Sequence, residues 1–181
     1  MLKPTATRED IVRVCEEAVE HRFASVCMNT TWLSVAVPIL RGSGVMPICV
    51  VGFPLGAALS SAKAGETRDA ISMGADEIDM VVNIGALKSG DYDLVMDDIR
   101  QVVAAAQGRP VKVILETGNL TDTEKIIGCT VGTVGLADPS RRTACMFNLI
   151  NLTMGGYDER LERPYVMYLW TVGGFGGSPR G

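Results

Sequence analysis

Residues 77–83, EIDMVVN, form a short apolar run interrupted by the carboxylate of Asp79, and this stretch decides how the chain is organised. A run of this length is typical of a buried strand, and Gly-Ala at 74–75 marks a turn before it. After the Ser-Gly-Asp turn at 89–91, residues 92–106 repeat apolar side chains at helical spacing. The stretch therefore predicts a strand followed by an amphipathic helix.

The same alternation extends to both sides. Further strands are predicted over 24–28, 47–51 and 111–116. Helices are predicted after the capping pair Thr7 and Asp10, over 31–40, from a cap at Ser60 or Ser61 to about 73, and after the pair Thr121 and Glu124. Four apolar strands separated by single helices pair in parallel, in a sheet covered on both faces. An α/β barrel and an open doubly wound sheet both fit, although no GxGxxG follows a strand to favour a dinucleotide-binding version of the open sheet.

Composition limits the function classes. The 181 residues are 47% hydrophobic, which predicts a globular domain with a real core, and the net charge of −4 favours neither a nucleic-acid nor a membrane partner. No apolar run is long enough to span a membrane and the first ten residues lack a signal-peptide core, so we expect a cytoplasmic protein. Five cysteines without a CxxC pair, with His21 as the single histidine, predict reduced thiols and no metal site. Because His21 follows Glu20 at the end of a predicted helix, we expect it at the surface rather than in a catalytic triad.

Two predicted strands carry charged residues among apolar ones. Side chains alternate between the two faces of a strand, so Asp79 shares a face with Val81 and Asn83, and Lys112 shares one with Ile114 and Glu116. If these strands are neighbours in a barrel, Asp79 and Lys112 both point into its interior. Buried charges are costly unless they are paired or functional, so an acid–base or amine site and a structural salt bridge are both open interpretations.

Several segments resemble deoxyribose-phosphate aldolase of the bacterial type. The matching strings are LKPTATREDI at 2–11, SVCMNTTWL at 25–33, VVGFPLGA at 50–57, GADEIDMVVNIGALKSGDYDLVMDDI at 74–99 and VKVILETGNLTDTEKI at 111–126. The resemblance implies a TIM (β/α)8 barrel and a class I aldolase that needs neither a metal nor a cofactor. Such an enzyme reversibly cleaves 2-deoxy-D-ribose 5-phosphate, a sugar phosphate, to acetaldehyde and glyceraldehyde 3-phosphate through a lysine Schiff base.

The resemblance also implies roles for three residues. Asp79 in EIDMV matches the family's catalytic proton-relay aspartate. Lys112 in VKVILET matches a lysine lining the substrate pocket, and Cys27 in SVCMN matches a cysteine of the pocket wall. Without the resemblance, Cys27 would be interpreted as a small buried apolar residue.

The sequence also departs from the family pattern. The Asp-His-Thr strand before the first matching segment, the Val-Lys-Thr-Ser-Thr-Gly strand with the Schiff-base lysine, and the later strand and phosphate loop have no counterpart. We therefore expect a partial barrel of about four βα units over 1–126 and a divergent tail over 127–181. Within the tail, 166–172 could form a strand and 173–177 a flexible end.

These departures leave a second functional interpretation open. An incomplete parallel sheet has unpaired edges, which predicts a homo-oligomer. The alternative to an aldolase is a catalytically inactive remnant of the family that oligomerises or binds a sugar phosphate weakly. Lys112 alone among the lysines lies in an apolar strand and could replace the missing amine, but a shift by one strand spacing, about 4.8 Å, argues against this substitution.

Overall fold

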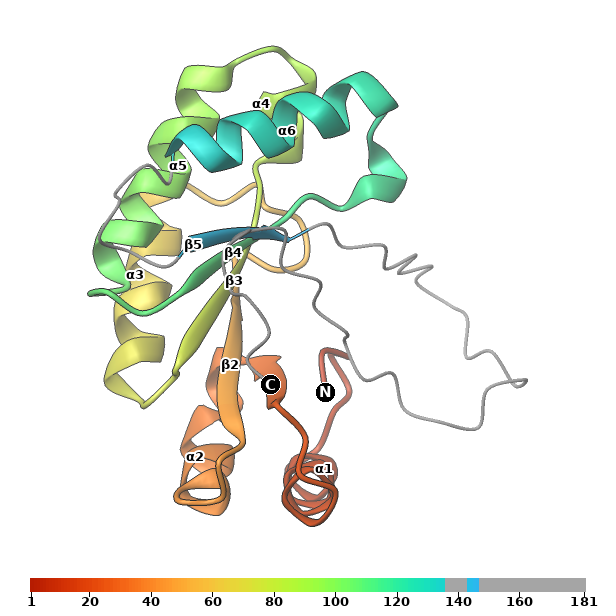
Figure 1. The fold of residues 1–181 in the computed structure, drawn as a ribbon, viewed down its shortest axis with the longest axis vertical. Helices are drawn as coiled ribbons and strands as arrows, with labels where there is room; N and C mark the ends of the chain where they lie inside the picture. Colours follow the sequence, from red (N-terminus) through yellow and green to blue (C-terminus); the bar gives the residue numbers. More distant parts are fainter. Residues whose placement is uncertain (136–142, 147–181) are drawn as a thin grey trace, which may run out of the picture.

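The computed structural model describes residues 1–135 and 143–146. Its strands form one sheet in which every neighbouring pair is parallel and the spatial order follows the chain. The sheet contains β1 (Ser25–Asn29), β2 (Met46–Val51), β3 (Glu77–Val81), β4 (Val111–Ile114) and β5 (Thr143–Met146). Figure 1 shows the strands fanned out in the middle of the molecule, with the helices along their outer side. The predicted α/β class and the parallel pairing of consecutive strands are confirmed.

The helices lie between the strands in the chain. They are α1 (Arg8–Glu20), α2 (Leu33–Leu40), α3 (Ser60–Ser72), α4 (Ile84–Lys88), α5 (Tyr92–Ala105) and α6 (Asp122–Gly135), with short 3-10 turns η1 (Thr30–Trp32) and η2 (Thr117–Asn119). Sequence periodicity did not predict α4, which is barely more than one turn long. It begins at Ile84, directly after its N-cap residue Asn83, whose Oδ1 accepts a hydrogen bond from the Ala86 amide at 3.0 Å.

Side-chain caps fix where several helices begin. At α1 the Asp10 amide donates to Thr7 Oγ1 at 3.3 Å and the Thr7 amide donates to Asp10 Oδ2 at 3.0 Å, which is the predicted capping box. Thr121 and Glu124 make the same reciprocal pair at α6. The predicted serine cap of α3 is wrong: the helix begins at Ser60 itself, after Leu59, whose side chain makes no capping bond.

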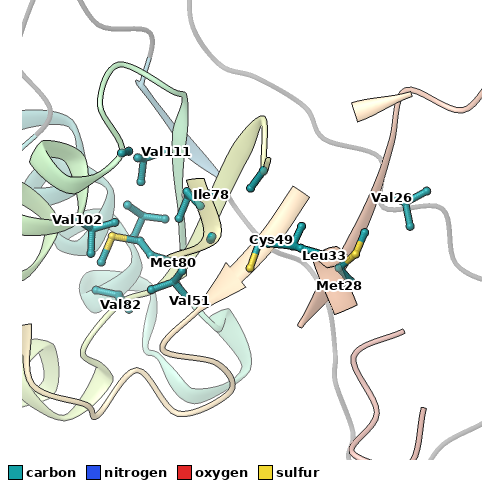
Figure 2. Packing of buried hydrophobic residues seen from close by; sticks show 14 of the residues in the cluster. Val26, Met28, Leu33, Cys49, Val51, Ile78, Met80, Val82, Val102 and Val111 are labelled. Carbon is teal, nitrogen blue, oxygen red and sulfur yellow. The ribbon is translucent and has the colours of Figure 1, made fainter. Parts of the chain in front are cut away.

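The main core lies between the sheet and the helices. On the outer face of β3, Ile78 and Met80 are fully buried, and the next strand contributes Val111 and Val113 to the same cluster. Figure 2 shows how side chains of β1 to β4 on this face pack with Leu33 of α2 and Val102 of α5. The apolar face of each strand therefore packs against helices, as period-two alternation predicts.

The opposite face of the sheet is built from the intervening residues. Val50, Val81 and Ile114 form a second buried cluster there, against which Leu2, Cys27, Phe53 and Ile84 pack. The alternation ends with the strands. Asn83 caps α4, and Glu116 lies beyond β4 with a positive φ of 53°, so neither continues the face as expected. We call the sheet face that carries Val50, Val81 and Ile114 the inner face.

The regular pattern extends beyond the matching segments. The predicted boundary between 1–126 and 127–181 falls inside α6, and β5 then pairs with β4 through Val111↔Thr143. Sequence analysis missed β5 because its four residues, TACM, are too short to show a period. The predicted strand over 166–172 and flexible end over 173–177 lie outside the described residues, and the domain division stays a prediction. No helix within the described ranges has the length and apolar character that a bilayer crossing requires.

Candidate functional site

Asp79 and Lys112 lie side by side on the inner face. They are register partners across β3 and β4, and Val50 of β2 is the partner of Asp79 on the other side. Asp79 is 0% exposed and Lys112 6% exposed. The structure therefore brings the two predicted charged residues together on neighbouring strands and buries both.

The ion-pair partner of Lys112 is Glu77 rather than Asp79. Lys112 Nζ donates to Glu77 Oε1, and both side chains are nearly buried. Glu77 precedes Asp79 by two positions on β3, so it lies on the same face. Sequence analysis did not single out Glu77, although period two, extended one step back from Asp79, would have found it.

One oxygen of Asp79 has no hydrogen-bond partner among residues 1–135 and 143–146. Its Oδ2 accepts from the Cys27 thiol at a long Sγ–Oδ2 distance of 3.9 Å, while no group in those ranges donates to its buried Oδ1. Burial raises the pKa of Asp79 from 3.8 to about 7. The positive charge of Lys112 lowers this pKa and the negative charge of Glu77 raises it, but burial is the largest of the three effects. Near neutral pH this carboxyl can therefore both take up and release a proton.

Cys27 lies on β1 at the edge of the same cluster. Its side chain is half-buried and packs against the inner-face cluster of Val50, Val81 and Ile114. Burial, reinforced by the nearby negative charge of Asp79, raises the pKa of the Cys27 thiol well above its ordinary value. The thiol therefore stays protonated near neutral pH, which suits a donor to Asp79 and not a nucleophile.

The remaining candidate groups lie elsewhere. His21 ends α1 as its C-cap residue and is exposed, as predicted. Across residues 1–135 and 143–146, no three side chains of the metal-ligating kinds His, Cys, Asp and Glu gather into a site that could hold an ion. The chemistry available on the inner face is thus that of one proton-exchanging carboxyl, one carboxylate–ammonium pair and one neutral thiol.

A family model, that of the DeoC/LacD family aldolases, matches residues 1–128. The chain belongs to the DeoC/LacD aldolase family. A deoxyribose-phosphate aldolase of Streptococcus suis (strain 05ZYH33) is 53% identical to it over 138 residues, which are 76% of this chain and 63% of that protein. This DeoC/LacD family chain thus spans less than two thirds of the relative it matches. The resemblance noted over 2–126 is confirmed, and enzymes of this family are lyases.

Solved structures confirm the architecture of this DeoC/LacD family member. An aldolase named QR15 is 31% identical, with a TM-score of 0.72 over 76% of this chain and 62% of that one. The tetrameric deoxyribose phosphate aldolase of Aeropyrum pernix is 27% identical, with a TM-score of 0.68 over 75% and 57% of the two chains. The five-stranded sheet is therefore part of a TIM barrel, whose interior corresponds to the inner face.

Proposed function

We propose that this chain belongs to a deoxyribose-phosphate aldolase, which reversibly cleaves 2-deoxy-D-ribose 5-phosphate to acetaldehyde and glyceraldehyde 3-phosphate through a lysine Schiff base. The name carried by the relative from Streptococcus suis supports this substrate. The structural observation that carries the proposal is Asp79, a fully buried carboxyl beside an ammonium group, with a pKa of about 7 and one oxygen that no described residue hydrogen-bonds.

Asp79 is proposed to move the protons that the cleavage requires. When the donor aldehyde is held as an imine, breaking the carbon–carbon bond delivers its electron pair to the imine nitrogen. The hydroxyl on the departing fragment must lose its proton, and the carbon of the resulting enamine must gain one. A carboxyl with a pKa of about 7 takes the first proton and returns the second without a large free-energy cost in either direction.

Lys112 and Cys27 are proposed to line the substrate pocket. The Lys112 ammonium is held by Glu77 on the same face of the sheet as Asp79, where it would favour anionic or polar substrate groups. The neutral Cys27 thiol donates to Asp79 and presents an apolar wall. We also propose a cytoplasmic enzyme of deoxyribose phosphate catabolism that works as a homo-oligomer, in line with the tetrameric relative from Aeropyrum pernix; sedimentation velocity gives its oligomeric state.

Borohydride trapping with acetaldehyde tests the Schiff base directly. The five lysines of the chain are Lys3, Lys63, Lys88, Lys112 and Lys125. The proposal expects one reduced ethyl adduct, confined to a single lysine in the native chain, and expects 2-deoxyribose 5-phosphate, added in place of acetaldehyde, to be reduced onto that same lysine. Peptide mapping identifies that lysine and asks whether Lys112 has taken over the role of the missing motif.

Two variants accompany this trapping: one tests the amine of Lys112, and the other is its control. Lys112→Met removes the inner-face amine, and Lys125→Met removes a partly exposed lysine paired with Asp122 on α6. The second variant is expected to trap acetaldehyde like the unmodified sequence. Adducts spread evenly over exposed lysines, with none formed from the sugar phosphate at a single lysine, would refute the Schiff-base proposal and favour the inactive remnant.

A further inference from the structure

A second buried lysine lies outside the candidate site. Lys63 of α3 is 0% exposed, which is rare for a lysine, and its Nζ makes two bonds. It donates to Asp98 Oδ2 of α5 at 2.5 Å and to the backbone carbonyl of Val81 at 2.9 Å. Asp98 is also buried, and within the part of the chain that the structure describes its Oδ1 has no hydrogen-bond partner, so burying this ion pair between two helices carries a desolvation cost.

The hydrogen bond from Lys63 to Val81 lies where β2 and β3 stop pairing. Pairing of β2 with β3 ends at Val51↔Met80, and β2 then turns away at Gly52 with a φ of +65°. Because the neighbouring strand leaves here, the carbonyl of Val81 takes its hydrogen bond from Lys63 instead. The lysine thus continues the bonding of β3 beyond the end of β2.

The stem of Lys63 and its neighbour Glu66 also hold the adjoining strand ends. A side chain at Gly52 would place its Cβ 2.8 Å from Lys63 Cε, so lysine and turn are in tight contact. One turn further along α3, Glu66 Oε2 accepts from the Gly52 amide at 2.9 Å and its Oε1 accepts from Thr30 Oγ1 at 2.8 Å. Thr30 directly follows β1, so the polar side of α3 is bonded to the ends of β1, β2 and β3.

We infer that Lys63 is a positioning residue for the aldolase site: through the carbonyl of Val81 it fixes the end of β3 and with it the Asp79 carboxylate, two residues away on the same face. The inference rests on the proposed function only for the role of Asp79. A buried apolar pair of similar size commonly matches or exceeds an ion pair in stability. The ionic pair therefore offers something that apolar packing would not, namely a donor for the carbonyl.

Two variants separate positioning from stability. Asp98→Asn removes the charge of the partner and leaves Lys63 to bond Val81. The double variant Lys63→Met/Asp98→Leu fills the space with apolar atoms and removes the bond. Its matched control, Lys125→Met/Asp122→Leu, makes the same two changes in the α6 ion pair, whose Asp122 is exposed and whose Lys125 is partly exposed.

The readout is the titration of Asp79, followed by carbon-13 NMR of labelled aspartate carboxyls and assigned with Asp79→Asn. Asp98→Asn and the α6 control are expected to titrate like the unmodified chain. The double variant is expected to melt within a few degrees of the unmodified chain. The pKa of Asp79 in this variant should move toward its ordinary value by about one unit, because water reaches the loosened strand end.

An unchanged Asp79 titration in the double variant would overturn the inference. Failure of that variant to fold would also overturn it, because the pair would then matter for stability and not for position. Neither result depends on turnover. If acetaldehyde trapping fails while the titration shifts as expected, the proposed function is wrong and the positioning of Asp79 by Lys63 stands.

Discussion

Replacing Asp79 by asparagine should stabilise the protein relative to the unmodified chain at pH 8. Most of this gain should be absent at pH 4. The folded chain holds the Asp79 proton until about pH 7, whereas the unfolded chain releases it near 3.8. Between these values the folded state binds one more proton than the unfolded state, so the free energy of unfolding falls as the pH rises. Asparagine does not ionise and avoids this loss.

The size of the effect follows from the shift in pKa. Each unit corresponds to about 1.4 kcal/mol, so the displacement from 3.8 to about 7 amounts to roughly 4 kcal/mol between the two limits. Asp79 is completely buried, so solvent screening takes little away from this figure. Asp79→Asn should therefore gain about 4 kcal/mol relative to the unmodified chain on going from pH 4 to pH 8, while losing the proposed proton relay.

Urea unfolding followed by circular dichroism at several pH values measures this difference. Asp122→Asn is the matched control, because Asp122 is exposed and the Lys125 beside it lowers its pKa. Its stability difference should run in the opposite direction, with asparagine the less stable above the ordinary pKa of the carboxyl. A difference for Asp79→Asn that stays constant from pH 4 to pH 8 would show that this carboxyl is not raised by burial.

Three further predictions concern packing, pairing and reactivity. Gly56→Ala should cost about 2 kcal/mol more than Gly44→Ala in thermal melts, because both glycines have positive φ but only at Gly56 would the Cβ collide with a backbone carbonyl, that of Val82; equal losses would contradict the close approach. Lys112→Met should lower the stability by about 3 kcal/mol by stranding Glu77, and Lys112→Met/Glu77→Leu should recover most of it; no recovery would mean that the pair is not the cause. Iodoacetamide at pH 8 should alkylate Cys27 far more slowly in the native chain than in urea, as mass spectrometry can show, because burial raises the pKa of its thiol; equal rates would refute its burial.

Local rules predicted the elements that are long enough to show a period or that carry a clear cap. The reciprocal pairs at Thr7 and Thr121 predicted helix starts that the structure has. Two elements escaped because they are too short for periodicity, namely α4 and β5. The serine cap expected at α3 failed because a serine near a helix start is only a preference, and here Leu59 occupies the capping position.

Local rules also predicted part of the candidate functional site. Alternation along a strand is a local property, so period two, together with the expectation that the two strands are neighbours in a barrel, predicted that Asp79 and Lys112 point to one face of the sheet. It did not predict that Lys112 would choose Glu77, since that choice depends on how far each side chain reaches across the register. Alternation along strands also did not identify Lys63 as a residue of interest, because Lys63 lies on a helix and not in an apolar strand.

The amino-acid sequence alone determined the order of strands and helices, the two faces of each strand, and which face would carry charge. These follow from backbone geometry, which repeats every two residues in a strand and every 3.6 in a helix. The tertiary structure decided the partners: Lys112 with Glu77, and Lys63 with Asp98 and the carbonyl of Val81. The two ion pairs join residues 35 positions apart, and only the packing of α3 on α5 and the register of β3 on β4 bring their atoms within bonding distance.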